Sequence, residues 1–364
     1  MNDANIYKGN LTPVSIGLLF EGMNIPEDIY DADADILIAR QGTMLGEGGK
    51  EKIMNLNAGR DIIYVSGRTQ QIMMERKSQF EEIKIAEIEE TTGYTGIKDE
   101  TFTLLGEIAQ TKTVKQEDLL SISSELSNRL EVTSPSVILS LINALAPVDE
   151  YLQRHCINVS LLNGLFGQWL GLSKNEVDKL VLVGLLHDCG KALIPAQVLN
   201  APRKLTVVEF EVIKMHPVLS YDLLKDFPEP VRRAVRCHHE KVNGMGYPER
   251  CERDSIPWEA RITAVSDIYD AMVSRRAYKN GRSPFSIMAM LIRLSDTEID
   301  SRLVNVFVKS MPQELIDKPV VMSDGSIGVV KGFDPEDIEY PMIDIGGEVI
   351  KSNANLFCSC MHSS

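Results

Sequence analysis

The spacing of hydrophobic positions changes twice along this chain, and its middle part has the spacing of helices. From about Thr101, apolar residues recur every three to four positions over roughly two hundred residues. Because such spacing places apolar side chains on one face of a helix, it predicts amphipathic helices. The clearest segments are Val137–Leu145, His155–Leu170, Val177–Leu186, Val231–His239, Ala260–Ser274 and Ile287–Leu294. No alternating strand pattern interrupts them, so we predict an all-α bundle.

Local signals at two expected helix starts support the bundle. Ser173 precedes Glu176 by three positions, and Thr206 precedes Glu209 in the same way. A hydroxyl and a glutamate at this spacing form a capping box, in which each side chain accepts a hydrogen bond from the other residue's backbone N–H. Both sequences therefore predict the first turn of a helix.

The two ends of the chain have short apolar runs bounded by turn residues, as is typical of strands. Near the N-terminus, Asp35–Ala39 and Asp61–Val65 are strand-like, with a short helix expected between them at Gly49–Leu56. After Pro312, strand-like runs are separated by turn residues and lie at Pro319–Met322, Ser326–Val330 and Met342–Ile345. The terminal Cys358–His362 could bind a soft metal, but partner ligands are missing elsewhere. A disordered, reduced tail is the favoured interpretation.

These patterns predict a multi-domain chain with four parts. Residues 1–68 form a small α+β N-terminal module, and the acidic stretch 69–114 forms a partly helical linker with a solvated charged face. Residues 115–312 form the helical domain, and residues 313–364 form a small β C-terminal module. The central all-α helical bundle is thus flanked by two smaller modules.

Composition and charge narrow the classes of function. The chain has 364 residues, of which 44% are hydrophobic and 25% charged, as in globular proteins with a sizeable core. Its net charge of −14 argues against DNA or RNA as a partner, because nucleic-acid binding needs a basic surface. An anionic substrate would need a local basic cluster. No secretory signal, membrane-length apolar run or disulfide spacing is apparent, so we expect a reduced, cytoplasmic protein without membrane contact.

The histidines carry the candidate chemistry. Five of the six fall between His155 and His239, in apolar helical surroundings. His187 and Asp188 close the apolar run that starts at Leu180, and Asp267 lies in a later helix-like segment. A single histidine there would most simply be a hydrogen-bonded core residue. Ionisable groups placed repeatedly in such surroundings cost free energy unless they are paired or bind metal, so shared ligation of a transition metal is the better interpretation.

Several motifs then resemble one family, the HD-GYP phosphodiesterases, which are a subgroup of the HD metal-dependent phosphohydrolases. The resemblance covers about residues 115–312 and implies an HD-type helical bundle. It rests on motifs in the right order and spacing, namely His187-Asp188-Cys189-Gly190-Lys191, His216-Pro217, His238-His239-Glu240 with Gly244-Met245-Gly246-Tyr247-Pro248, and Ser266–Ala271 with Arg275–Lys279. The flanking modules lie outside the resemblance.

The resemblance implies hydrolysis of cyclic di-GMP to pGpG, and in some members on to GMP. It also implies that Asp188 bridges two divalent ions that share a hydroxide, which two ions ~3.5–4 Å apart would allow. The first ion would be held by His155, His187, Asp188 and Asp267, and the second by Asp188, His216, His238 and His239. Iron or manganese is the expected metal, with zinc and nickel as alternatives.

Further residues receive expected roles from the same resemblance. Asp188 and Lys191 would act in catalysis, with Lys191 at a phosphate oxygen. Arg276 and Lys279 would bind the other phosphate or the transition-state charge, although plain surface charge is the alternative for all three cations. The remaining substrate contacts are expected in the loop at Gly244, Gly246 and Tyr247. The two glycines permit positive φ, so the loop can turn tightly, and Tyr247 of the GYP sequence would form one wall of the substrate site.

Three questions stay open in the sequence. Some relatives have a glutamate one helical turn before the first histidine, where this chain has Tyr151, so we expect two metals rather than three and pGpG as the main product. A cyclic di-GMP receptor with little or no activity, or a phosphodiesterase for another cyclic dinucleotide, is the alternative function. A signalling protein bound through the GYP loop or the terminal modules, and a homodimer, are the partners considered.

Overall fold

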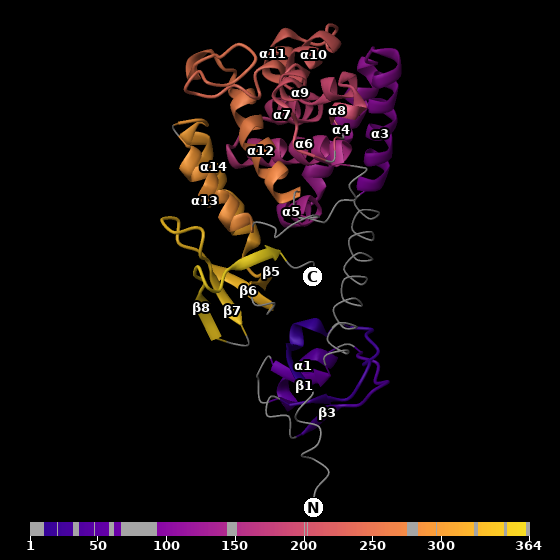
Figure 1. Cartoon of the computed structure of the whole chain (residues 1–364), viewed down its shortest axis with the longest axis vertical. Helices are drawn as coiled ribbons and strands as arrows, with labels where there is room; N and C mark the ends of the chain where they lie inside the picture. Colours follow the sequence, from indigo (N-terminus) through magenta and orange to yellow (C-terminus); the bar gives the residue numbers. More distant parts are fainter. Residues whose placement is uncertain are drawn as a thin grey trace, which may run out of the picture. The chain divides into compact units, whose positions relative to one another are not determined.

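A computed structural model of the chain describes residues 11–19, 21–31, 36–46, 48–57, 62–66, 93–143, 151–199, 201, 203–274, 283–295, 297–323, 327–345 and 348–361. The chain is mostly helical, with one small sheet near each end (Figure 1). It divides into two compact units, of which one is Ile88–Glu314 and the other combines Met1–Glu87 with Leu315–Ser364. Among the described helices, none combines the length and the hydropathy that a membrane span requires.

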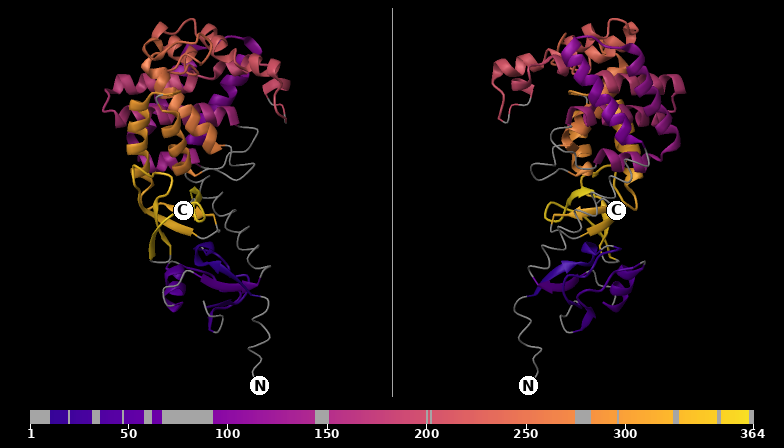
Figure 2. Two further views of the ribbon diagram at one scale, coloured as in Figure 1. Left: turned by 60° about the vertical axis from the view of Figure 1, so that its left-hand side comes forward. Right: turned by 90° about the vertical axis from the view of Figure 1, so that its right-hand side faces the viewer.

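The unit Ile88–Glu314 is a bundle of helices. Its elements are α3 (Tyr94–Thr111), α4 (Gln116–Val132), α5 (Pro135–Asn143), α6 (Tyr151–Trp169), α7 (Lys174–Leu186), the 3-10 turn η5 (Cys189–Leu193), α8 (Ala196–Leu199), α9 (Val207–Ile213), α10 (His216–Leu223), α11 (Glu229–Arg236), α12 (Trp258–Ser274), α13 (Pro284–Leu294) and α14 (Ser301–Ser310). Two turned views show the short α8 and α9 projecting from the rest of the bundle (Figure 2).

Helices α6 and α7 form the central pair of this bundle, and they cross at very close range. At Gly184 of α7, an added Cβ would lie 2.6 Å from the Cα of Ser160 on α6, so only a glycine fits there. The Ser160 hydroxyl donates to the Val181 carbonyl at 2.7 Å, and the Asn163 amide donates to the Leu180 carbonyl at 3.1 Å. The pair is therefore fixed by backbone proximity as well as by apolar burial.

Each predicted helical segment corresponds to a helix over its described residues, with Ala144 and Leu145 outside them, and both capping boxes are present, at Ser173 and Thr206. One predicted end was wrong by more than one residue. Helix α11 stops at Arg236, three residues before the predicted end at His239, with Cys237 as its C-cap. His238 and His239 consequently lie just beyond the helix, so the helical geometry does not fix the directions of their side chains.

The expected linker contains a helix that packs on the bundle. Within 69–114, the described part begins at Gly93 and includes α3. This helix buries Ile97, Leu104 and Ile108, and the hydroxyl of its Tyr94 donates to Asn158 on α6 at 2.7 Å. The compact helical unit accordingly starts at Ile88, earlier than the predicted boundary at residue 115.

The N-terminal sheet has the strand order β1-β4-β2-β3, with antiparallel pairs. Its strands are β1 (Leu11–Ser15), β2 (Ile29–Tyr30), β3 (Leu37–Ala39) and β4 (Ile62–Ser66), and α1 (Gly49–Leu56) matches the predicted short helix. Ile16, Ile25, Ile29 and Ile63 are fully buried in its core. The prediction found β3 and β4 but missed β1 and β2, which form the sheet with them.

The C-terminal sheet has the strand order β8-β7-β6-β5-β9, again with antiparallel pairs. Its strands are β5 (Pro319–Met322), β6 (Ile327–Gly332), β7 (Met342–Ile345), β8 (Glu348–Lys351) and β9 (Cys358–Met361). The prediction of a disordered tail was wrong over Cys358–Met361, and His362 lies outside the described residues. Strand β9 pairs with β5, and Cys358 is buried with its sulfur 3.9 Å from that of Met322.

Candidate metal centre

Five histidines and two aspartates meet inside the helical unit, although they come from distant parts of the chain. His155 lies on α6, and His187 caps the end of α7 with Asp188 directly after it. His216 begins α10, His238 and His239 follow α11, and Asp267 lies on α12. Burial is nearly complete for His155, His187, Asp188, His216 and His238. Buried ionisable groups at this density need a common partner.

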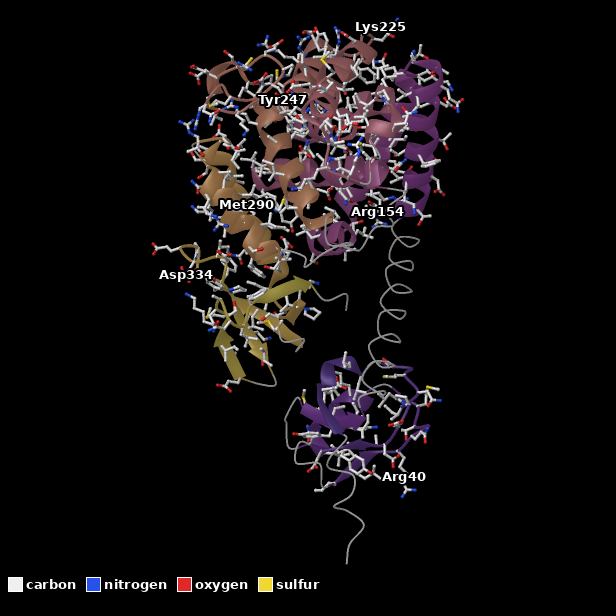
Figure 3. The ribbon with its side chains drawn as sticks, in the orientation of Figure 1. Arg40, Arg154, Lys225, Tyr247, Met290 and Asp334 are labelled. Atoms are coloured by element: carbon white, nitrogen blue, oxygen red, sulfur yellow. The ribbon has the colours of Figure 1, made fainter. Side chains whose placement is uncertain are left out.

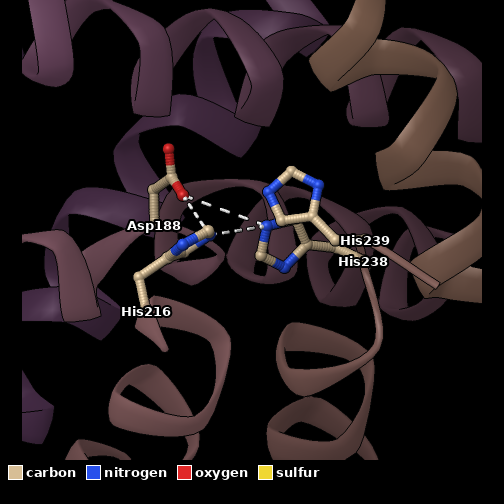
Figure 4. A group of neighbouring side chains, drawn as sticks. All are labelled: Asp188, His216, His238 and His239. Atoms are coloured by element: carbon tan, nitrogen blue, oxygen red, sulfur yellow. Dashed lines mark hydrogen bonds and ion pairs between the residues drawn. The ribbon is translucent and has the colours of Figure 1, made fainter. Parts of the chain in front are cut away.

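The residues form two groups that share one aspartate. His155, His187 and Asp267 make the first group. Asp188, His216, His238 and His239 make the second group, which is drawn in Figure 4. Asp188 lies between them, because its Oδ2 is 3.4 Å from the Nε2 atoms of both His155 and His187. Its Oδ1 is 3.1 Å from the Nε2 of His216 and 3.9 Å from that of His238. Each carboxylate oxygen thus faces one group.

The second ring nitrogen of four histidines is fixed by a hydrogen-bond acceptor. The Nδ1 atoms of His187, His216 and His238 lie 2.7, 2.7 and 2.6 Å from the carbonyl oxygen three residues earlier. The Nδ1 of His155 lies 2.7 Å from Asp270 Oδ2. Carbonyl and carboxylate oxygens only accept, so each Nδ1 carries the proton and each Nε2 presents a lone pair to the centre.

Those lone pairs face one another, which favours a cation between them. The Nε2 atoms of His155 and His187 are 3.2 Å apart, and those of His216 and His238 are 3.3 Å apart. Asp188 Oδ1 is buried and has no hydrogen-bond donor. Two nitrogens ~2.1 Å from one ion are separated by about 3.0–3.4 Å when they are neighbouring ligands. The residues therefore fit a divalent metal in each group.

The electrostatics of the centre keep the ligands deprotonated. Burial lowers the pKa of His187 and of His238 below the ordinary histidine value. Burial also lowers the pKa of His239 to about 3. Burial alone would raise the pKa of Asp188, but the Lys191 ammonium and the neighbouring histidines outweigh it and hold the pKa well below its usual value. Neutral imidazole and ionised carboxylate are the forms that bind metal.

The structure places the remaining predicted residues as follows. Lys191 is part-buried on η5, and its ammonium forms an ion pair with Asp188 Oδ2. The ring of Tyr247 stacks beside that of His239, with centroids 4.7 Å apart, at the partly exposed side of the centre. Arg276 and Lys279 lie outside the described residues.

The two loop glycines have different roles. Gly244 has φ of 72°, which agrees with the predicted positive φ. Gly246 is not in that region, so the prediction of positive φ was wrong for it. An added Cβ at Gly246 would collide with the backbone of Glu240 and Lys241. Gly246 is required because two backbone segments touch there, and this contact brings the loop against the histidines.

Glu240 holds the loop in place, and sequence reasoning gave it no role of its own. Its carboxylate is buried and accepts backbone hydrogen bonds from Glu249 at 2.6 Å and from Arg250 and Cys251 at 3.0 Å. Arg250 has φ of 58°, an uncommon conformation for a residue with a side chain. The three bonds over-determine this turn, so the wall formed by Tyr247 has a fixed position.

Asp270 is a second residue that the sequence prediction missed. It is fully buried on α12, where Oδ2 accepts from His155 and Oδ1 accepts from Asn158 at 2.8 Å. The available signal was its spacing, because Asp267 and Asp270 are three positions apart and share a helix face. Cys189 and Cys237 are buried fillers, and burial raises the pKa of each thiol to about 12.

Replacing Asp270 with asparagine should weaken metal binding while the fold is kept. An amide has a single acceptor oxygen, so either His155 or Asn158 loses its partner and the imidazole is less well oriented. We expect metal affinity to fall about 10–100-fold, measured by competition with a chromogenic chelator. Asp178→Asn, at a half-exposed pair with Lys174, is the matched control and should leave metal affinity unchanged. Equal affinity in both variants would contradict an orienting role.

Comparison with known proteins adds a family and several relatives. Residues 106–303, more than half of the chain, match the model of a family described as HD domain. The chain is 34% identical over 211 residues to the cyclic di-GMP phosphodiesterase response regulator RpfG of Xanthomonas campestris pv. campestris, covering 56% of each protein. It is 32% identical over 185 residues to a cyclic di-GMP phosphodiesterase of Thermotoga maritima, covering 50% of each.

Two further likenesses concern specificity and fold. The chain is 29% identical over 184 residues to the 3'3'-cGAMP-specific phosphodiesterase 2 of Vibrio cholerae, covering 50% of this chain and 35% of that protein. The chain spans about half the length of the curated relatives first matched. Among solved structures, Bd1817, described as a HDG"Y"P protein from Bdellovibrio bacteriovorus, has a TM-score of 0.50 at 14% identity, covering 83% of this chain and 100% of that chain. This last likeness is one of fold.

Proposed function

The chain belongs to the HD domain family, and from this membership we propose that it is a metal-dependent phosphodiesterase that hydrolyses cyclic di-GMP to pGpG. The observation that carries the proposal is the position of Asp188, with one oxygen toward each histidine group. A carboxylate shared between two ligand sets is what a pair of metal ions acting on one phosphodiester requires. Relatives named as cyclic di-GMP phosphodiesterases support the choice of substrate.

In this proposal the two ligand groups hold two divalent ions, with iron or manganese as the expected metals. When bound, such ions polarise a phosphate oxygen and lower the pKa of water. His155, His187 and Asp267 serve one ion, His216, His238 and His239 serve the other, and Asp188 serves both. The protein's own contribution is to aim the Nε2 atoms of four histidines inward, through the carbonyl and Asp270 contacts, and to lower the pKa of His187, His238 and His239 by burial.

Lys191 is proposed as the residue that meets the phosphate charge. Its ammonium pairs with Asp188 yet has three protons, so it can donate to a phosphate oxygen at the same time. Arg276 and Lys279 are proposed to hold the second phosphate, and Gly244, Gly246 and Tyr247 to line the substrate. A cyclic dinucleotide carries two phosphodiesters, so one cation for each phosphate matches its charge.

The test is product analysis with several substrates. The iron- or manganese-loaded protein is incubated with cyclic di-GMP, and nucleotides are separated by chromatography. Appearance of pGpG supports the proposal, and GMP as the main end product would contradict pGpG as the product. The likeness to a 3'3'-cGAMP-specific phosphodiesterase makes cyclic GMP-AMP the second candidate substrate. Unchanged cyclic di-GMP that co-elutes with the protein would instead indicate a receptor.

Lys191→Ala should separate catalysis from metal binding. Because Lys191 is not among the metal-ligating groups, metal content should match that of the parent protein. Loss of the ammonium at the phosphate should lower kcat/KM about 10²-fold. Lys174→Ala, at an exposed ion pair with Glu131, provides the control and should change neither value. Metal loss in Lys191→Ala would argue against a phosphate role.

The finer organisation of the chain is also proposed. We propose four parts, of which the N-terminal module 1–68 and the C-terminal module 313–364 keep their predicted bounds, while α3 moves from the predicted linker 69–114 to the predicted helical domain 115–312 because it packs on the bundle. A cytoplasmic location, and a signalling partner at the Gly244–Pro248 loop or the terminal modules, complete the proposal. Size-exclusion chromatography with light scattering would test the homodimer.

A further inference from the structure

A cavity of about 540 Å³ adjoins the metal centre between α9 and the Gly244–Pro248 loop. Its lining combines apolar, aromatic and charged side chains, and Phe210, Glu211 and Lys214 have no role in the proposal above. Tyr247, labelled in Figure 3, forms its wall toward the metal centre, because the same ring stacks beside His239. A substrate phosphate at the metals therefore brings the attached nucleoside to this cavity.

Two aromatic rings and one ammonium group define the inside of the cavity. Lys214 Nζ is 5.0 Å from the centroid of the Phe210 ring and 5.8 Å from that of the Tyr247 ring. Phe210 is 48% exposed, so about half of this apolar side chain is accessible to a ligand. Aromatic side chains of this kind provide stacking surfaces for nucleobases.

The cavity lining has one carboxylate, Glu211, beside the cations Lys214, Lys241 and Arg250. Glu211 Oε1 is 2.7 Å from Lys214 Nζ, and Lys241 Nζ is 2.6 Å from Oε2 of Glu298, which does not line the cavity. A second phosphate placed beside the Glu211–Lys214 pair would face the Glu211 carboxylate, which is unfavourable. An aromatic group with hydrogen-bond donors and acceptors at its edge matches this pair better. A nucleobase has this chemistry.

We infer that the cavity binds a guanine base of the substrate and that Glu211 and Lys214 select guanine over adenine. Guanine presents N–H donors at N1 and N2 beside an acceptor at O6, so its edge matches a carboxylate beside an ammonium. Adenine presents an acceptor at N1 and a donor at N6. In the same position, adenine N1 would face the Glu211 carboxylate, which is also an acceptor, and adenine N6 would face the Lys214 ammonium, which is also a donor. This inference rests on the proposed function, because it deepens the choice of substrate.

The cavity exists before a ligand arrives, which makes such selection effective. Glu240 holds the loop by three backbone hydrogen bonds, so the Tyr247 wall does not have to form on binding. Glu211 and Lys214 are three positions apart around α9, so the helix fixes their spacing. Pre-organised donors and acceptors lose less entropy on binding and penalise a mismatched base more strongly.

The test compares guanosine 5'-monophosphate with adenosine 5'-monophosphate, measured by calorimetry on the metal-loaded full chain. The two probes share ribose and phosphate, so any difference in Kd comes from the base. We expect about tenfold tighter binding of GMP, and Glu211→Gln should reduce that ratio to near one. Lys214→Met should weaken GMP binding by a similar factor and should not weaken AMP binding. Glu229→Gln, at an equally exposed pair with Arg232 outside the cavity, should keep the parent ratio.

The outcomes separate this inference from the proposed function. Equal binding of GMP and AMP by the parent chain, or an unchanged ratio in Glu211→Gln, overturns the inference even if cyclic di-GMP is hydrolysed. A GMP preference that Glu211→Gln removes supports it even if no cyclic dinucleotide is hydrolysed, in which case the proposed activity fails alone. Hydrolysis of bis(p-nitrophenyl) phosphate, which has no base edge, should be equal in the parent and both cavity variants.

Discussion

Replacing Asp188 with asparagine is expected to remove nearly all phosphodiesterase activity. The amide keeps the size of the side chain but removes its charge and one of its two acceptor oxygens, so only one histidine group keeps a ligand at this position. We expect turnover of cyclic di-GMP to fall on the order of 10³-fold, because several kcal/mol of stabilisation by the metal pair are lost. Metal per chain, measured by elemental analysis, should fall in parallel.

The buried position of Asp188 makes a structural control necessary. Asp188 is 1% exposed and pairs with Lys191, so its replacement also leaves an ammonium without its partner. The double variant Asp188→Asn with Lys191→Met removes that buried charge. If the double variant recovers stability, measured by thermal unfolding, but not metal or activity, the loss is due to the ligand. Near-parental activity in either variant would reject the site.

A methyl group at position 184 is expected to have the largest effect on stability. The added Cβ of Gly184→Ala would lie 2.6 Å from Ser160 Cα and 2.8 Å from the Val159 carbonyl oxygen, both on the backbone of α6. Backbone atoms cannot rotate away, so the two helices must separate. We expect the free energy of unfolding to fall by about 1–3 kcal/mol, measured by urea denaturation.

The same substitution should reach the metal centre through geometry alone. His155 lies on α6, and His187 follows α7 and hydrogen-bonds to the Gly184 carbonyl, so separation of the helices moves the two ligands apart. Gly106→Ala on α3 is the matched control, because an added Cβ there meets nothing within 4 Å. It should raise stability slightly through better helix propensity. A Gly184→Ala protein as stable as the parent would contradict the close crossing.

The sequence predicted the parts of this protein that depend on local patterns. Helical spacing located the segments around α6, α7 and α12, because apolar residues recur every three to four positions in each of them. The ligand set was also accessible, since histidines next to apolar runs are uncommon unless they are used. The resemblance to the HD-GYP family then implied a division of these residues into two groups, and the structure brings the same residues together.

The features that the sequence did not reveal depend on distant partners. Strand β9 is ordered by pairing with β5, which lies almost forty residues earlier, so Cys358 gave no local signal. Strand β2 has only two residues and is defined by its neighbours. Asp270 and Glu240 act through other residues rather than on a metal, and a role of this kind depends on the partner's position. The steric need at Gly246 likewise arises from a backbone that comes close only after folding.

The wide separation of the ligands along the chain links metal supply to protein lifetime. His155 and Asp267 are 112 positions apart, so an unfolded chain cannot present the set, and an ion that binds only the native form stabilises it in proportion to the logarithm of its concentration. When metal is scarce, a larger fraction of the chains would open and be removed by proteases. Under the proposed function, the amount of folded protein would in this way follow the supply of metal.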